Sequence, residues 1–575
     1  MTQEGYAPHT EKALLGLAYY KRNNEGEWVL RPRWKALGIS TVVLLFVIYF
    51  AAVNAFYCFN RYYRECEETS YSDMFLYVIP NRIPFTKIIF LPEFINQHIV
   101  NARLRQQARL GDMLFKNPSS IYDLIAAARL SPDNLDAQLQ AARLFLAPGL
   151  RINRIEEAFD ALDLTVPRAL QSKDFFLQYA QLAFHFDQDR RIIASAEQYL
   201  DDPAMSADAR IVLATSYAEA LFLRGELLKS EAVLKKYDLY KTLSGILLAS
   251  QIMWENGEKN RAINFLTRIN TELGNNPAKE KVLYSLAKFY WEENRNKEAA
   301  QVLQEISRLH PSDFRSRIYT LVLLDNPEER QAAIETILRQ FGSNEGAMLA
   351  LGGYAADKGN VELQDRVYAL SIQNRFKNLS NFRLLKVETL LMAKKNTEVI
   401  EDISNLLTTR PNWLEKDPVI QSQFDSLRML AYYSNNQPDL GNIRFKELLN
   451  SPVTTVPMLV SIARRLQTVN RPEEAEQLLR KAYVRNHNNL GALLELVKIS
   501  LKSEDANALG QYLGNLLEAR RPPRYILQSA YERISSDRFL FTPNREKLIE
   551  EVSEMLRTRV LPANEVEKQW PSSPL

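Results

Sequence analysis

The sequence contains only two cysteines among its 575 residues, Cys58 and Cys66. Two thiols cannot form the disulfide framework of small secreted domains, and their spacing is not that of a paired-thiol redox motif. On one continuous helix the two residues would be about 12 Å apart along the axis, which is beyond the reach of a disulfide. We interpret them as isolated thiols, with an intermolecular bridge or a redox role as the alternatives.

Other signatures of chemistry are also missing. Seventy-two Lys and Arg balance sixty-nine Asp and Glu, and no long block carries one sign, so charge does not predict nucleic-acid binding. The five histidines are scattered, with no two at the spacing of metal ligands. No glycine-rich phosphate loop, nucleophile-elbow serine or Cys-His pair is recognisable. We therefore expect no metal, no cofactor and no enzyme active site.

One long hydrophobic run stands out near the amino terminus. Residues 36–57, ALGISTVVLLFVIYFAAVNAFY, carry no charge, and about twenty such residues span a bilayer as a helix. Lys and Arg are denser before this run than after it, which predicts a cytoplasmic tail at residues 1–35 and export of the chain beyond residue 57. A signal peptide cleaved near residues 53–55 is one alternative, and an array that faces the cytoplasm is another.

Residues 58–117 are rich in aromatic side chains and in proline. Pro80, Pro84 and Pro92 exclude a continuous helix, since proline removes a backbone hydrogen bond and clashes with the preceding turn. This segment could lie on the membrane surface, contact another membrane protein or cover the first repeat of the array. Residues 95–115 then have the pattern of an arginine-rich amphipathic helix.

From residue 118 to about residue 535 the pattern predicts a series of helical pairs, each about 34 residues long. The clearest pair lies between Leu283 and Pro311, where apolar residues recur at helical spacing on either side of a polar NRNK turn. Its core positions are Leu283, Leu286, Ala287, Tyr290, Ala299, Leu303 and Ile306. Gly225 and Gly257 stand where the first helix of earlier pairs ends, a position that favours positive φ.

This pattern resembles the tetratricopeptide (TPR) repeat. The resemblance implies an all-α fold, a right-handed solenoid of helical hairpins that binds other proteins. Small residues such as Ala218, Ala262, Ala287 and Ala299 would allow the helices of a hairpin to approach closely. The match is weak from Leu379 to Pro457. Residues 536–575 are predicted to provide a capping helix, from Asn544 to Val560, and a disordered tail.

A candidate protein-binding groove lies on the face of the first helices that the repeat pattern does not use. Phe222, Trp254 and Trp291 each stand one residue beyond a core position in three successive repeats. The predicted groove residues are Phe222, Gln251, Trp254, Lys281, Tyr284, Lys288 and Trp291. Large aromatic side chains of this kind are common anchors of protein interfaces. The alternative is that these rings pack as peripheral core.

Together these features predict a membrane-anchored scaffold that binds proteins on the exported side of the inner membrane. Few cysteines in a large exported region fit a bacterial periplasm. The resemblance to envelope TPR proteins suggests secretion, polysaccharide export or envelope biogenesis as its setting. The alternatives are a cytoplasm-facing adaptor and, in third place, a subunit of a membrane enzyme complex, with an unrecognised site in residues 379–457 or 58–117.

Overall fold

A computed structural model describes residues 17–23, 25–60, 108, 110–147, 154–274, 276–409 and 417–563 of the protein, with backbone alone for residues 50–60. The chain divides into two compact units, Met1–Ala141 and Ala142–Leu575. Most of the predicted segment 58–117, the side chains of both cysteines and the predicted tail from residue 564 onward lie outside the described residues.

The first unit begins with a β-hairpin, which the prediction of a polar tail over residues 1–35 overlooked. Strand β1 (Ala18–Arg22) pairs antiparallel with β2 (Trp28–Pro32), and Tyr20 faces Leu30 across the pair. Aromatic and β-branched residues favour strands, and Gly26 takes the positive φ of +87° that the turn requires. The segment was too short and too charged for alternation of apolar residues to reveal it.

Helix α1 (Trp34–Asn60) follows the hairpin directly and contains the apolar run predicted at residues 36–57. Among the described residues, no helix combines the length and the apolarity that crossing a membrane requires.

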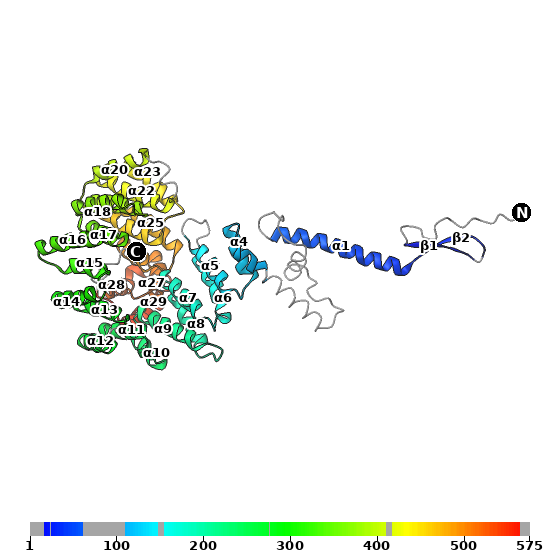
Figure 1. The fold of residues 1–575 in the computed structure, drawn as a ribbon, viewed down its shortest axis with the longest axis horizontal. Coiled ribbons are helices and arrows are strands. Elements are labelled where there is room, and N and C mark those ends of the chain that lie inside the picture. Colours follow the sequence, from blue (N-terminus) through cyan, green and yellow to red (C-terminus); the bar gives the residue numbers. More distant parts are fainter. Residues whose placement is uncertain are drawn as a thin grey trace. The chain divides into compact units, whose positions relative to one another are not determined.

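The remaining described chain is a succession of helices, as the repeat pattern predicts (Figure 1). They are α4 (Ile121–Leu130), α5 (Leu135–Leu146), α6 (Ile155–Thr165), α7 (Lys173–His185), α8 (Asp189–Tyr199), α9 (Ala207–Leu223), α10 (Leu227–Lys236), α11 (Leu243–Glu255), α12 (Lys259–Leu273), α13 (Lys279–Glu292), α14 (Asn296–Leu309), α15 (Arg315–Leu323), α16 (Pro327–Phe341), α17 (Glu345–Lys358), α18 (Val361–Gln373), α19 (Leu379–Met392), α20 (Asn396–Thr409), α22 (Pro418–Ser434), α23 (Pro438–Asn450), α24 (Val456–Thr468), α25 (Pro472–Arg485), α26 (Leu490–Ser503), α27 (Ala506–Glu518), α28 (Arg524–Ile534) and α29 (Arg545–Thr558). The described residues also include the short 3-10 helices η2 (Val166–Arg168), η3 (Leu239–Lys241) and η4 (Asp537–Phe539).

Most hairpins turn through one residue with a left-handed backbone. Gly225 (φ +78°) and Gly257 (φ +81°) confirm the prediction, and Asn294 (φ +59°) and Asn470 (φ +60°) occupy the same place in other hairpins. In each case the next amide donates to the carbonyl five residues earlier, as from Glu226 to Leu221, which satisfies an unpaired carbonyl at the helix end. The turn therefore stops the first helix and starts the second.

In the clearest hairpin the predicted core positions are buried except Tyr290, which is partly buried. Ala218, Ala262, Ala287 and Ala299 are all fully buried, which lets the paired helices approach closely. In the hairpin of α13 and α14, Leu283, Leu303 and Ile306 share one apolar cluster, and α14 ends two residues before Pro311. The region from Leu379 to Pro457, where the pattern is weak, also folds as the helical hairpins α19–α20 and α22–α23.

The second unit closes on itself, which the sequence did not predict. Helices α27 and α29 end close to the α9–α10 turn (Figure 1). Hydrogen bonds join the two regions, such as Arg521 N to Leu223 O at 3.0 Å and Val560 N to Gly225 O at 3.1 Å. The predicted terminal helix is present as α29, and Leu548, Val552 and Met555 extend the apolar cluster of the last hairpins. Beyond α29 the chain contacts the α9–α10 turn.

Candidate protein-binding face

The three predicted aromatic residues occupy equivalent places in the structure. Phe222, Trp254 and Trp291 lie near the ends of α9, α11 and α13, each three residues before the left-handed residue of its turn. The three residues therefore occupy the same position in successive hairpins, as the sequence predicts. Their surroundings nevertheless differ, because the neighbouring elements differ.

Two of these rings are buried. Trp254 is 9% exposed and stacks on Phe289 of α13, with ring centroids 4.2 Å apart and planes 3° apart. Phe222 is 7% exposed. Trp291 is partly buried and packs against the apolar cluster of α13 and α14. The predicted aromatic stripe is therefore not a continuous exposed surface, and Trp254 packs as core between neighbouring first helices.

The polar members of the predicted groove remain accessible to different degrees. Lys281 is exposed, and Gln251 is partly buried. Lys288 is partly buried and lies 3.4 Å from Glu292 in an ion pair. The hydroxyl of Tyr284 donates to the Asp313 carboxylate, and burial together with this acceptor raises the pKa of Tyr284 well above its ordinary value. Partner binding by these residues stays a prediction.

The ring of Phe222 is covered by a later part of the same chain, residues 518–523, which we call the closing segment. The guanidinium of Arg521 lies over the Phe222 ring, 4.8 Å from its centroid. Nη1 of Arg521 is 3.0 Å from Oε2 of Glu255, at an angle that does not make a hydrogen bond. The backbone of the closing segment is extended at Ala519, just after the end of α27. Two prolines, Pro522 and Pro523, keep it from joining a helix.

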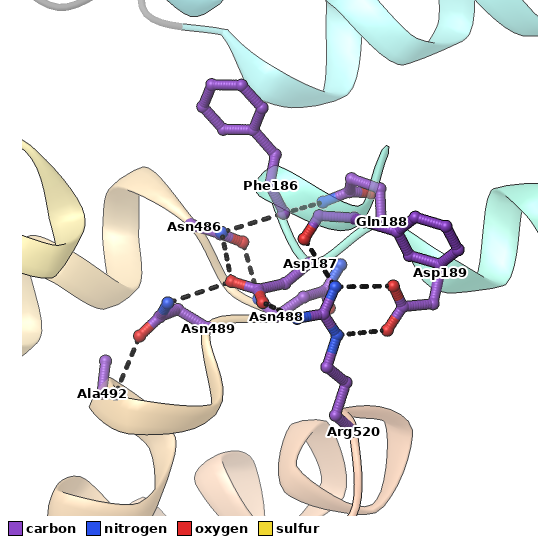
Figure 2. Close-up of polar contacts among 10 residues, drawn as sticks. Phe186, Asp187, Gln188, Asp189, Asn486, Asn488, Asn489, Ala492 and Arg520 are labelled. Carbon is purple, nitrogen blue, oxygen red and sulfur yellow. Dashed lines mark hydrogen bonds and ion pairs between the residues drawn. The ribbon is translucent and has the colours of Figure 1, made fainter. Parts of the chain in front are cut away.

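Arg520 of the closing segment is held by the turn between α7 and α8 (Figure 2). Its Nε and Nη2 donate to the two carboxylate oxygens of Asp189 at 2.6 and 2.8 Å, and Nη2 also donates to Phe184 O at 2.5 Å. Nη1 lies 3.3 Å from Asp187 Oδ1. Burial alone would lower the pKa of Arg520, but Asp189 and Asp187 outweigh it and raise that pKa. The guanidinium is thus fully charged and tightly bound.

The Asp187 carboxylate joins the α7–α8 turn to the α25–α26 turn (Figure 2). It accepts from Asn489 Nδ2 at 3.0 Å and from Asn486 Nδ2 at 3.3 Å. Asn489 is also the N-cap of α26, because its Oδ1 accepts from the amide of Ala492 at 3.0 Å. Burial raises the pKa of Asp187, opposed by Arg520 and Asn489. The Asn489 side chain therefore serves both the start of α26 and the contact with α7–α8.

We call the surface formed by Asp187, Asp189, Phe222 and Glu255 the docking face. It spans the α7–α8 turn, α9 and α11, and the closing segment lies on it. Of these residues, only Phe222 is among those predicted from the sequence. Two features of the sequence could have indicated this contact: Arg520 and Arg521 before two prolines, and Asp187 and Asp189 close together at a helix turn. Nothing in the sequence shows that these two distant features meet.

A second contact lies beside the docking face, at the α9–α10 turn. The buried Arg224 donates from Nη1 to Glu518 O at 2.5 Å, at the end of α27. Burial, with the nearby Arg559 and Arg190, lowers the pKa of Arg224 to about 10. A Cβ added to Gly225 would lie 2.7 Å from Val560 O. Glycine is needed there for its positive φ and for this close approach.

A cavity of about 680 Å³ opens beside this second contact. Its charged lining residues are Arg190, Arg224, Lys229, Arg559, Glu226, Glu518, Glu551 and Glu554. Acidic and basic groups are equal in number, so the cavity favours neither anions nor cations. In the part of the chain that the structure describes, no three His, Cys, Asp or Glu side chains are placed together as metal ligands.

Comparisons with known proteins identify no family. No family model and no curated protein matches the chain. Yeast Tom70 matches at 13% identity and a TM-score of 0.33, covering 78% of this chain and 99% of that chain. The APC/C hetero-tetramer Cut9–Hcn1 matches at 11% identity and a TM-score of 0.24, covering 68% and 88%.

Naa15/Naa10 bound to HypK-THB matches at 14% identity and a TM-score of 0.24, covering 79% of this chain and 80% of that chain. TM-scores this low carry no functional argument. The class of the protein rests on its own helices, whose antiparallel hairpins and left-handed turns define a TPR-like α-solenoid.

Proposed function

We propose that this protein is a scaffold that binds other proteins through the first helices of its hairpins. One observation carries the proposal: the docking face already holds a largely non-helical stretch of polypeptide, the closing segment. It does so as peptide-binding surfaces do, with a backbone hydrogen bond to Leu223 O, an aromatic contact at Phe222 and a bidentate ion pair at Asp189.

The surface next in the array, on α11 and α13, is the proposed site for a separate partner. Lys281 is exposed and Lys288 is partly exposed in its ion pair with Glu292, whereas Tyr284 packs against the α13–α14 cluster beside them. A partner with acidic groups opposite these lysines would gain charge complementarity.

We further propose that α1 anchors the scaffold in a membrane. Its side chains Ile39, Val42, Val43, Leu44, Leu45, Phe46, Val47 and Ile48 are each more than half exposed to solvent. Exposure of so many apolar side chains to water is unfavourable, and their transfer into the hydrocarbon of a bilayer is favourable. The basic residues before it favour a cytoplasmic amino terminus, with the array in the periplasm. Anchoring would raise the local concentration of membrane partners, as in an assembly for secretion, polysaccharide export or envelope biogenesis.

Capture of partners tests the binding function. The full chain, tagged at its carboxyl terminus, is extracted in mild detergent, and the proteins that accompany it are compared between wild type and Lys281→Glu/Lys288→Glu. We expect the charge reversal to reduce capture at least about fivefold without changing the melting temperature. Lys547→Glu on α29 is the matched control, since Lys547 is exposed and, like Lys288, pairs with a glutamate four residues later. Equal capture by wild type and the double variant would refute this face as the site.

Protease treatment of intact spheroplasts tests the membrane placement. Digestion of the array from outside supports the exported topology. Full protection of the carboxyl terminus refutes it and supports the cytoplasm-facing adaptor.

A further inference from the structure

The docking face contains two neighbouring sites that each suit a guanidinium. The first consists of the Asp189 carboxylate, Phe184 O and the Asp187 carboxylate, which surround Arg520. The second consists of the Phe222 ring and the Glu255 carboxylate, which receive Arg521. Because consecutive residues fill the two sites, the docking face matches an arginine pair.

The chemistry of both sites favours arginine over lysine. Asp189 is bound by two parallel N–H groups, a geometry that a planar guanidinium has and an ammonium lacks. The Phe222 ring is covered by a flat cation, which stacks better than a compact hydrated one. Glu219 adds a further carboxylate close to Arg520.

The contact between the closing segment and the docking face is mainly polar. The large apolar cluster of the last hairpins, which includes Leu513, Leu516 and Ala519, contains no described residue of α7 to α11. Ion pairs, hydrogen bonds and the cation–π contact at Phe222 hold this contact, and the groups of a second polypeptide can make the same interactions. An arginine pair from another polypeptide could therefore replace the closing segment without breaking a shared core.

We propose that the docking face is a binding site for polypeptide segments that carry two adjacent arginines, and that the closing segment is its built-in competitor. The inference rests on the proposed protein-binding function and specifies the chemistry of the partner. Because the closing segment belongs to the same chain, a partner competes against an intramolecular contact. Binding of the partner opens the closed array.

A peptide of residues 518–524, EARRPPR, is the probe. Its binding to the full chain in detergent is measured by fluorescence polarisation, for wild type and for Arg520→Ala/Arg521→Ala. We expect the double variant, which lacks its own competitor, to bind the peptide at least about tenfold more tightly than wild type. Arg538→Ala is the matched control, since Arg538 forms an exposed ion pair with Glu504 at 2.6 Å. It is expected to behave as wild type.

Two changes test the chemistry of the site. A peptide with lysine in place of Arg520 and Arg521, and Arg524 unchanged, should bind the double variant at least about fivefold more weakly. Asp189→Asn, added to the double variant, should abolish peptide binding. Equal binding of the arginine and lysine peptides would overturn the specificity.

Equal binding of the peptide to wild type and the double variant, or binding to neither, would overturn the proposal. If the double variant does not fold, the rate of amide hydrogen exchange in Asp189→Asn tests whether Asp189 holds the closing segment on the docking face. The amides of Arg521 and Val560 should then exchange at least about tenfold faster than in wild type, because both donate across the contact. Unchanged exchange overturns the proposal. The two proposals can fail separately. If the peptide binds as expected but Lys281→Glu/Lys288→Glu captures the same partners as wild type, the partner site on α11 and α13 is refuted and the docking-face proposal is retained.

Discussion

The carboxylate of Asp189 accepts two hydrogen bonds from the guanidinium of Arg520, which lies 331 residues further along the chain. Asp189 is the first residue of α8, and Arg520 lies just after α27. The hairpins between them are therefore enclosed by this ion pair together with the contacts that Arg521, Val560 and Asn489 make with the same early hairpins. These contacts convert a row of hairpins, each packed on its neighbours, into a closed array.

Replacing Arg520 by alanine should destabilise the protein. The substitution leaves the Asp189 and Asp187 carboxylates buried without their cation, which costs roughly 2–4 kcal/mol for a largely buried pair. Arg520→Lys should recover less than half of the loss, since one ammonium cannot serve both oxygens of Asp189. Urea denaturation measures the free energy of unfolding. Arg538→Ala, at an exposed pair, is the control and should cost under about 1 kcal/mol.

Replacing Gly225 by alanine should disturb the closing contact as well as the turn. Alanine at φ +78° is strained by about 1 kcal/mol, and its Cβ would also lie 2.7 Å from Val560 O. Gly257→Ala isolates the first effect, because Gly257 has φ +81° and nothing within 4 Å of an added Cβ. We expect Gly225→Ala to lower the melting temperature further and to speed exchange of the Val560 amide. Identical effects of the two substitutions would mean that the close approach to Val560 contributes nothing.

Replacing Trp254 by alanine should behave as a core truncation. The ring is buried and stacked on Phe289, so its loss should cost about 3–5 kcal/mol of unfolding free energy. Lys288→Ala on α13 should change stability by less than about 0.5 kcal/mol. Unfolding in urea and partner capture are measured on the same preparations. Lost capture with unchanged stability in Trp254→Ala would restore this ring to the binding surface.

The stability of the closed array should depend on pH through Asp187. Burial raises the pKa of this carboxyl above its ordinary value of 3.8, so the folded protein holds the proton more tightly than the unfolded chain. The cost of burying the charge is present at neutral pH and is relieved as pH falls through the folded-state pKa toward 3.8.

Asp187→Asn removes this dependence, because an amide does not titrate in this range. The free energy of unfolding of wild type, relative to Asp187→Asn, should therefore increase between about pH 7 and pH 4. Urea denaturation at a series of pH values measures the difference. A decrease instead would show that Arg520 and Asn489 outweigh burial and lower the pKa.

The sequence predicted the features that depend on neighbouring residues. The core positions of α13 and α14, the left-handed turns at Gly225 and Gly257 and the helix at α29 all arise from patterns within one hairpin. The hairpin of β1 and β2 was missed, although its turn glycine was visible, because such short strands give little periodicity. Phe222 was predicted to line an open groove, whereas its ring is buried under Arg521, a partner that the sequence did not indicate.

By itself, then, the sequence determined the repeating unit, since helix periodicity and turn residues act over about 34 residues. Only the tertiary structure decided that the array closes and that Arg520 and Arg521 cover the α7–α11 surface. The reason is geometric: small rotations between successive hairpins add up along the array, so the meeting of Asp189 and Arg520 depends on every interface between them.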